Sequence, residues 1–359
     1  MINVTKTFLP PLDEYIKYLE KIWDTSWVTN QGPLAEELEN RLKEFLDVRN
    51  LLLVTNGTIA LQLAIRALDL KGEIITTPYS YVATTTSILW ENCTPIFCDI
   101  EKNSFCIDPA NIEKAITENT SAILATHVYG FPCDIEKIQA IADKHNLKVI
   151  YDGAHAFGVK YKEQSLLNFG DISTVSFHAT KLFHTIEGGA VIVKDEKVAE
   201  KIFLYRAFGH LDDEYFSIGI NGRTSEFHAA MGLCNLSRVY DFIEKRKKIN
   251  LMYKEYLDGT PLSFPVISEN IFYNYSYFPV FFLTPESMLS AKQLLSENGI
   301  NTRRYFYPSL NKLPYLNYSE CPVSEFTAER VLCLPLYNDL GIDHIKKIAL
   351  IINKSFNLK

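Results

Sequence analysis

The chain has 359 residues, which is long for a single simple core and predicts two packed lobes. Hydrophobic residues make up 47% and charged residues 22%, an ordinary composition for a globular protein in water. The formal net charge of −7 disfavours a nucleic-acid-binding protein, because such proteins neutralise phosphates with basic side chains.

Neither targeting segments nor metal sites are expected. The first fifteen residues contain no apolar stretch of the kind found in signal peptides, and no apolar run approaches the roughly 20 residues of a membrane span. We therefore expect a cytoplasmic protein without a membrane partner. The seven cysteines include no CxxC pair, so neither a zinc site nor a disulfide framework is indicated, and no metal is expected.

Residues 51–194 alternate between short strand-like runs and helical patterns. Apolar, β-branched runs occupy residues 51–54, 73–77, 95–100, 122–127, 148–152, 173–177 and 190–194. Most segments between them have helical patterns, for example residues 59–68 and 134–145. Buried strands that alternate with helices predict an α/β fold with a mainly parallel sheet. Ligands bind at the carboxyl ends of the strands in such sheets, so the residues after each run are candidate site residues.

The pattern changes from Glu226 onward. Long helical segments extend to about Leu257, and a second α+β segment follows. It consists of a strand over 274–283, a helix over 285–299 and a closing helix from Ile342. We place the boundary between the lobes near Tyr240, which divides the chain into a large domain of residues 1–240 and a small domain of residues 241–359.

One candidate for covalent chemistry lies in the segment SFHATKLFHTIEGG, residues 176–189. Lys181 follows a buried strand and precedes paired glycines. A lone lysine is usually a solvated surface charge. A lysine held in a partly desolvated pocket, however, is what a Schiff base with pyridoxal phosphate (PLP) requires.

Two other segments fit the same cofactor, although each has a plain structural interpretation. Asp152 ends a strand in IYDGAHAFG, where a carboxylate could pair with a protonated pyridine nitrogen or simply cap a helix. Gly57 and Thr58 open an amphipathic helix whose free N–H groups could bind a phosphate, or Asn56 could simply cap it. The sequence has no GxGxxG or GxxxxGK motif for a dinucleotide or P-loop site.

Taken together and in order, the segments NGT, TPYSYVAT, HVYGFPCD, DGAHAFG, SFHATKLFHTIEGG and NGRTSEFHAAMGL resemble the DegT/DnrJ/EryC1/StrS family of PLP-dependent sugar aminotransferases. The resemblance covers nearly the whole chain. It implies the fold of fold-type I aminotransferases, with a large domain around a mainly parallel sheet and a small C-terminal α+β domain. It also implies a homodimer with active sites at the subunit interface.

The resemblance assigns roles to single residues. Lys181 matches the lysine that binds PLP covalently, and Asp152 matches the partner of the pyridine nitrogen. His155 matches a group near the phenolic oxygen, so these three residues form the expected catalytic set. Tyr81 matches the aromatic side chain that stacks on the cofactor ring.

The resemblance also assigns residues that bind the cofactor phosphate. Gly57 and Thr58 match the phosphate cradle, and Ser176 matches a further phosphate ligand. Asn221, in GINGR, matches the residue that the partner subunit lends to this phosphate. The family usually has DAAH or DAAQ where this chain has DGAH, so Gly153 replaces an alanine.

Three segments are expected to contact the sugar substrate. The segment TSWVTNQGPL resembles a glycine loop of the family near the sugar, RRYFYPSL resembles part of the nucleotide-sugar pocket, and the loop after Lys181 flanks the reacting centre. The aromatic side chains of these segments could equally belong to the core. The substrate-binding candidates are Thr29, Asn30, His184, Arg304, Tyr305 and Tyr307.

Around the lysine, the sequence resembles the branch that aminates C-4 rather than C-3 of a deoxysugar. C-3 enzymes typically read SFYPGKNLGALGDGG there. The resemblance implies transfer of an amino group from L-glutamate to dTDP-4-keto-6-deoxyglucose, which gives dTDP-4-amino-4,6-dideoxyglucose for O-antigen or other surface glycans. The alternatives are a C-3 aminotransferase acting on a dTDP-3-keto-6-deoxyhexose and a non-catalytic effector-binding regulator. A sugar dehydratase on the same fold has histidine in place of Lys181 and is disfavoured.

Overall fold

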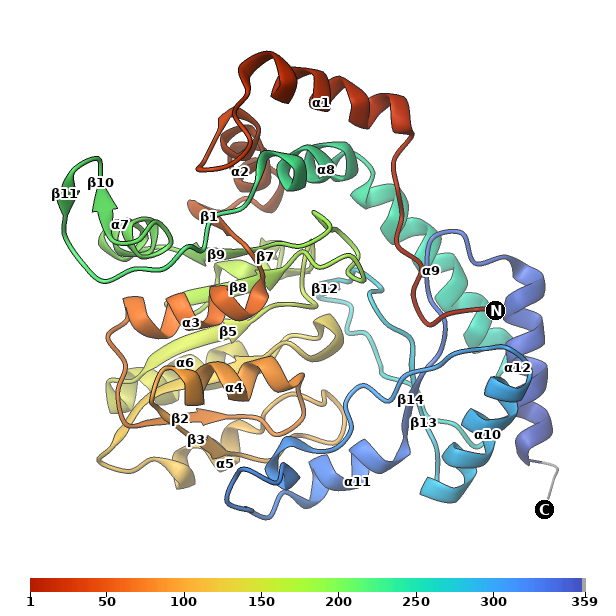
Figure 1. Ribbon diagram of the computed structural model, residues 1–359. Coiled ribbons are helices and arrows are strands. Elements are labelled where there is room, and N and C mark those ends of the chain that lie inside the picture. Colours follow the sequence, from red (N-terminus) through yellow and green to blue (C-terminus); the bar gives the residue numbers. More distant parts are fainter. Residues whose placement is uncertain (357–359) are drawn as a thin grey trace.

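The computed structural model describes residues 1–356 and has a seven-stranded sheet at the centre of its larger lobe (Figure 1). The strand order is β1-β9-β8-β5-β4-β2-β3. Strand β9 is antiparallel to both of its neighbours, and all other neighbouring strands of this sheet are parallel. The strands are β1 (Asn50–Val54), β2 (Glu73–Thr76), β3 (Thr94–Phe97), β4 (Thr120–Thr126), β5 (Lys148–Asp152), β8 (Ile172–Ser176) and β9 (Gly189–Val193).

The predicted fold class is confirmed, because each of the seven apolar runs forms one strand of this sheet. Strand β3 is shorter than predicted and ends at Phe97, and β4 ends at Thr126, one residue before His127. The parallel strands β5 and β8 pair side by side and end at Asp152 and Ser176. Two of the candidate site residues therefore lie at the same edge of the sheet.

Helices cover both faces of the central sheet. On one face, a hydrophobic cluster joins the sheet to α3 (Gly57–Ala67), α4 (Val82–Trp90) and α7 (Glu196–Tyr205). On the other face, a larger cluster includes α2 (Pro33–Leu46), α5 (Pro109–Ala115), α6 (Ile135–His145) and α8 (Glu226–Leu236). Consecutive residues of β4 alternate between these clusters, because side chains along a strand point to opposite faces.

The N-terminal region and two small sheets complete the larger lobe. Helix α1 (Leu12–Thr25) packs on α8, and α2 follows it. A hairpin of β10 (His210–Leu211) and β11 (Glu214–Tyr215) projects from the lobe (Figure 1). The third sheet pairs β12 (Ile271–Phe272), β6 (Lys160–Tyr161) and β7 (Gln164–Ser165), and short 3₁₀ helices lie at Val128–Gly130, Leu166–Asn168 and Leu310–Lys312.

The smaller lobe has a core of its own. Its elements are α9 (Val239–Tyr256), β13 (Pro279–Phe281), α10 (Pro285–Glu297), α11 (Pro322–Arg330), β14 (Val331–Cys333) and α12 (Ile342–Phe356). Buried side chains of most of these elements, including Tyr253, Val280 and Ile348, form one cluster. Only three residues of the predicted strand 274–283 pair with β14, so the rest of that apolar segment is irregular.

Two observations bear on the predicted division at Tyr240. This residue is the second residue of α9, and the helix continues through it into the smaller lobe. Ile2 pairs with Ile300 and belongs to the core of the smaller lobe, although the prediction assigns it to the large domain. The chain therefore starts on the smaller lobe and then crosses to the larger one. Within residues 1–356 no helix is both long and apolar enough to cross a membrane.

Candidate active site

A cavity of about 390 Å³ opens at the carboxyl edge of the sheet, between the two lobes. Most residues that were predicted to bind the cofactor line this cavity. They are Gly57, Thr58, Tyr81, Asp152, His155, Ser176 and Lys181. The fold thus brings together side chains from segments that are more than a hundred positions apart in the sequence.

Lys181 lies in the loop between β8 and β9 and projects into the cavity. Its Nζ atom donates a hydrogen bond to the hydroxyl group of Tyr277, at 3.2 Å. Burial lowers the pKa of the ammonium group, and the Asp152 carboxylate partly opposes this shift. A lowered pKa increases the neutral amine fraction, which is the nucleophilic form of a lysine.

Asp152 is the last residue of β5, and its side chain is almost completely buried. Oδ2 accepts a hydrogen bond of 2.7 Å from the hydroxyl of Thr84, and Oδ1 accepts one of 3.0 Å from the backbone N–H of Ala154. Burial raises the pKa of this carboxyl group, while both hydrogen bonds and the Lys181 charge lower it. No cationic side chain among residues 1–356 forms an ion pair with this carboxylate.

His155 is buried beside the cavity and is held in one orientation. Its Nδ1 atom accepts a hydrogen bond of 3.1 Å from the backbone N–H of Tyr129, so the ring proton of the neutral form is assigned to Nε2. Burial holds the pKa of His155 well below its ordinary value, and the charge of Lys181 adds to this effect. The ring lies parallel to that of Phe306, with 5.5 Å between the ring centres.

Helix α3 supplies a backbone cradle at the opposite end of the cavity. The side chain of Asn56 accepts a hydrogen bond from the N–H of Ile59, at 2.9 Å, and so caps the helix. A Cβ atom at Gly57 would come within 3.0 Å of the Cβ atom of Ser176. Glycine therefore leaves room at the point where the helix N-terminus faces the cavity, and helix N-termini attract anions.

The atoms around residue 153 explain why glycine occupies this position. A Cβ atom at this position would lie 2.5 Å from the Cδ2 atom of Leu167 and 2.9 Å from the carbonyl oxygen of Thr174. The alanine that is usual in related sequences would require both groups to move. Glycine is thus matched to the packing below this edge of the sheet.

Of the remaining predicted residues, only one lines the cavity of the described chain. Tyr305 lines the cavity. Asn221 is exposed at the base of the β10–β11 hairpin and does not line the cavity of its own chain. Thr29 and Asn30 lie in an exposed loop before α2 and do not line it either.

Three further substrate-binding candidates do not line the cavity. His184 is buried, and its Nε2 atom lies 2.8 Å from the carbonyl oxygen of Phe8, so the ring joins the N-terminal segment to the core. Arg304 and Tyr307 pack on each other, with 3.3 Å between the guanidinium carbon and the ring centre. The guanidinium group of Arg304 and the ring of Tyr307 therefore contact each other outside the cavity.

Sequence reasoning missed three residues that contact the predicted set. Thr84 binds Asp152, Tyr277 binds Lys181, and Arg303 lines the cavity beside Tyr305. Thr84 lies in the segment TPYSYVAT, so its position one helical turn after Tyr81 offered a signal. Arg303 opens the segment RRYFYPSL, which was expected at the substrate pocket, but its neighbour Arg304 was chosen instead. Tyr277 offered no signal, because it comes from the smaller lobe, whose approach to the sheet edge is a tertiary feature.

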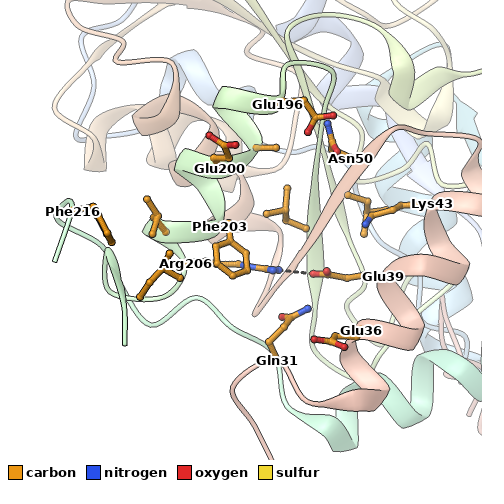
Figure 2. Close-up of a pocket in the computed structure, with 15 residues that line it drawn as sticks. Gln31, Glu36, Glu39, Lys43, Asn50, Glu196, Glu200, Phe203, Arg206 and Phe216 are labelled. Atoms are coloured by element: carbon orange, nitrogen blue, oxygen red, sulfur yellow. Dashed lines mark hydrogen bonds and ion pairs between the residues drawn. The ribbon is translucent and has the colours of Figure 1, made fainter. Parts of the chain in front are cut away.

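A larger cavity of about 590 Å³ lies elsewhere, between α2, β1, α7 and the hairpin (Figure 2). Its floor contains a buried ion pair between Arg206 and Glu39, at 2.5 Å. Arg206 also donates to the carbonyl oxygen of Leu53, and Glu39 accepts from the N–H of the same residue. None of the predicted catalytic or cofactor-binding residues lines this cavity.

The chain is similar to known proteins over nearly its whole length. The DegT/DnrJ/EryC1/StrS aminotransferase family matches residues 12–353. The chain is 44% identical over 357 residues to a dTDP-4-amino-4,6-dideoxy-D-glucose transaminase of Shigella dysenteriae, and the match covers 97% of each protein.

Solved structures are similar over nearly the whole chain. The structure of DesI in the presence of its TDP-sugar product superposes with a TM-score of 0.94 at 30% identity, covering 98% of this chain and 92% of DesI. NtdA from Bacillus subtilis, solved with bound cofactor PMP, superposes with a TM-score of 0.87 at 27% identity, covering 95% of this chain and 82% of NtdA. The chain therefore belongs to the DegT/DnrJ/EryC1/StrS aminotransferase family.

Proposed function

We propose that this protein is a PLP-dependent aminotransferase that moves an amino group from L-glutamate to C-4 of dTDP-4-keto-6-deoxyglucose. The product would be dTDP-4-amino-4,6-dideoxyglucose, a building block for O-antigen or other surface glycans. The observation that carries the proposal is the meeting of Lys181 and Asp152 in one cavity at the carboxyl edge of the sheet. The substrate is inferred from the relative that shares 44% of its residues with this chain.

The residues around the cavity fit each chemical part of PLP. The N-terminus of α3, with Gly57 and Ser176, fits the phosphate, because helix N-termini attract anions and glycine allows Ser176 to lie close to this terminus. Asp152 is a buried carboxylate without a cationic partner in the described chain, and a protonated pyridine nitrogen would supply that partner. Tyr81 lines the cavity and is 57% exposed, which leaves a ring available to cover the cofactor.

Bound PLP supplies the electron sink that stabilises a negative charge at the carbon next to the amino group. Lys181 would hold the cofactor and, once displaced by the donor, would take the proton from the α-carbon of glutamate. The same amine would return this proton on the cofactor side of the reacting nitrogen. The lowered pKa of Lys181 suits this work, because a neutral amine is needed to accept the proton.

Neighbouring groups would keep Lys181 and the cofactor in position. The Tyr277 hydroxyl binds the Lys181 amine and limits the positions that it can reach. His155 is neutral and has Nε2–H free of the Tyr129 contact, so it can donate a hydrogen bond without adding charge. We propose that this donor faces the phenolic oxygen of PLP.

We also propose that the protein acts as a homodimer with shared sites. Asn221 is exposed and absent from the cavity of its own chain, as expected for a residue that serves a partner. The hairpin that precedes it exposes large apolar side chains, among them Tyr215 at 78%, Phe216 at 56% and Ile218 at 94%. Exposed apolar patches of this kind are typical of protein–protein contacts.

The function is tested by incubating the purified protein with glutamate and, separately, with the 4-keto and 3-keto dTDP-6-deoxyhexoses. We expect amination of the 4-keto sugar, with the position and stereochemistry of the new amine determined by NMR. Amination of only the 3-keto sugar would contradict the C-4 assignment and leave the aminotransferase assignment intact. A protein that binds sugar nucleotide without a visible absorbance band from bound PLP would instead favour a regulator.

A further inference from the structure

A second positive charge lines the cavity next to Lys181. Arg303 and Arg304 are adjacent in the sequence but diverge in space. Arg303 lines the cavity, and its guanidinium carbon lies 5.5 Å from the ring centre of Tyr305. Arg304 stacks on Tyr307 and donates a hydrogen bond of 3.2 Å to the carbonyl oxygen of Ala328, outside the cavity.

The backbone of Arg303 is fixed to the smaller lobe. It pairs with Cys333 in both directions, through hydrogen bonds of 3.3 Å from its N–H and 2.8 Å to its carbonyl oxygen. Seven residues later, the N–H of Leu310 donates to the carbonyl oxygen of Pro78, at 2.8 Å, and so ties the same segment to the larger lobe. The arginine therefore stands on a segment that is anchored at both ends.

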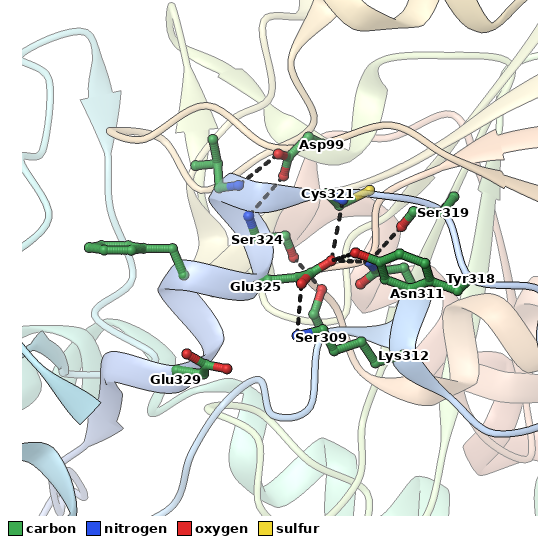
Figure 3. A network of polar contacts seen from close by, with 12 residues as sticks. Asp99, Ser309, Asn311, Lys312, Tyr318, Ser319, Cys321, Ser324, Glu325 and Glu329 are labelled. Atoms are coloured by element: carbon green, nitrogen blue, oxygen red, sulfur yellow. Dashed lines mark hydrogen bonds and ion pairs between the residues drawn. The ribbon is translucent and has the colours of Figure 1, made fainter. Parts of the chain in front are cut away.

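A polar network strengthens the second anchor (Figure 3). The carboxylate of Glu325 accepts hydrogen bonds from Asn311 at 2.7 Å and Tyr318 at 3.0 Å, and it pairs with Lys312 at 2.7 Å. Asp99 accepts from two backbone N–H groups at the start of α11 and joins this helix to the larger lobe. Both anchors act on the backbone of this segment, and the Arg303 side chain itself is exposed at the cavity.

The guanidinium group of Arg303 contacts the side chain of Tyr305, which is not an anion. Among residues 1–356, no carboxylate forms an ion pair with it. Glu187 also lines the cavity, but its carboxylate lies near the His178 ring, at 3.5 Å. Of the arginines and lysines in the described chain, only Arg303 and Lys181 line the cavity, and the Lys181 amine is reserved for the cofactor.

A chain of contacts links Arg303 to the reacting amine. Tyr277 binds the Lys181 amine, its ring centre lies 5.6 Å from that of Tyr305, and the guanidinium carbon of Arg303 lies 5.5 Å from the Tyr305 ring centre. Burial raises the pKa of Tyr305, and the positive charges of Arg303 and Lys181 both oppose that rise. The two cations therefore act on the same phenol from within one cavity.

We propose that Arg303 binds a carboxylate group of the amino donor. This inference rests on the proposed function and specifies how its site holds the amino donor. A planar guanidinium group forms two parallel hydrogen bonds with a carboxylate, which sets both position and orientation. Both carboxylates of glutamate are joined to the reacting nitrogen by a short aliphatic chain. The diphosphate of the sugar nucleotide, in contrast, is separated from the reacting C-4 by the whole hexose ring.

The test measures the two substrates separately on the PLP-loaded protein. The variants are Arg303→Gln, which removes the charge, and Arg303→Lys, which keeps the charge but loses the planar fork. Arg66→Gln is the matched control, because the Arg66 side chain is 60% exposed and pairs with Glu91 outside the cavity. Glutamate is titrated against the absorbance of bound cofactor, and binding of glutarate, which has no amine, is measured by calorimetry. Binding of dTDP is measured by the same method.

We expect Arg303→Gln to raise the half-saturating glutamate concentration and the glutarate dissociation constant by roughly 10- to 100-fold, as for lost hydrogen bonds to a charged group. Arg303→Lys should fall between Arg303→Gln and the wild type, and dTDP binding should change less than about threefold, within the range of a lost surface charge. Weaker dTDP binding with an unchanged glutamate response would overturn the inference and assign Arg303 to the diphosphate. A wild-type protein that does not respond to glutamate would overturn the proposed donor itself, and the inference with it.

Discussion

Replacing Asp152 with asparagine tests the electrostatic part of the site without changing its shape. The backbone N–H of Ala154 can only donate, so the amide oxygen must stay on that side. The amide NH₂ then faces the hydroxyl of Thr84, which can accept and donate its own proton to Ser80 Oγ, 2.8 Å away. All buried polar groups remain satisfied, and we expect the variant to fold.

We expect the Asp152→Asn substitution to lower the rate of the reaction. A neutral amide cannot keep the pyridine nitrogen protonated, so the electron sink is weakened. Losing a hydrogen bond between charged groups costs about 1.5–3 kcal/mol, which corresponds to a rate reduction of roughly 10- to 150-fold. The assay is the single-turnover rate with saturating glutamate, followed by the absorbance of the bound cofactor. Asp69→Asn is the control, because Asp69 is exposed and pairs only with Lys201 in the described chain.

The same substitution has an unusual expected effect on stability. Burial raises the pKa of Asp152 above its unfolded value, so the cofactor-free folded protein binds more protons than the unfolded chain. This contribution to stability is present below the unfolded pKa and is lost as the pH rises through the folded pKa. At neutral pH the buried carboxylate therefore costs stability, and the cofactor-free Asp152→Asn protein should melt at the same or a higher temperature. A rate reduction below about tenfold, or a clearly lower melting temperature, would refute this reasoning.

Lys181→Ala should abolish turnover while the protein remains folded, which circular dichroism and a product assay would establish; normal turnover would exclude Lys181 as the reacting amine. Tyr277→Phe should lower the single-turnover rate by roughly 10-fold through the lost hydrogen bond to the amine, with little change in cofactor retention by dialysis. Asn221→Ala should release PLP more readily, and mixing it with Lys181→Ala should restore activity in hybrid dimers, whereas no recovery on subunit exchange contradicts a shared site. Gly153→Ala should reduce the free energy of unfolding by about 1–3 kcal/mol in denaturant titrations, because its Cβ atom meets Leu167.

The sequence carried enough information for the central sheet because its strands are short, apolar on both faces and separated by helical patterns. The helices α1 and α2 were not predicted. Local signals were present in α2, where Pro33 opens the helix and Leu34, Leu38, Leu42 and Leu46 recur at helical spacing. What the sequence could not show is that the distant carboxylate of Glu226 binds the start of this helix, which has no side-chain cap of its own. Such a contact between residues 192 positions apart has no local signature.

Asp152 ends a strand and Gly57 opens a helix, so local sequence was enough to place both at the edge of the sheet where the cavity lies. Local sequence was not enough to tell apart two neighbours in an extended segment. Successive side chains of an extended backbone point to opposite sides, so either Arg303 or Arg304 could have faced the cavity. The direction is set by the pairing of Arg303 with Cys333, which only the folded chain provides. The orientation of His184 also could not be predicted, because the N-terminal segment that binds its ring is remote in sequence.

The buried pair of Arg206 and Glu39 also bears on how the protein responds to ionic strength. The backbone carbonyl oxygen of Arg206 accepts a hydrogen bond from the N–H of Gly222, next to Asn221, so the residue that forms the buried pair also holds the base of the projecting hairpin. Salt screens exposed charges strongly but buried pairs only weakly. The exposed apolar side chains of Tyr215, Phe216 and Ile218, at the end of β11 and after it, would make contacts that kosmotropic salts strengthen. Concentrated sulfate should therefore preserve the hairpin's attachment and favour its association with a second subunit, while exposed pairs such as Lys201 with Asp69 are weakened.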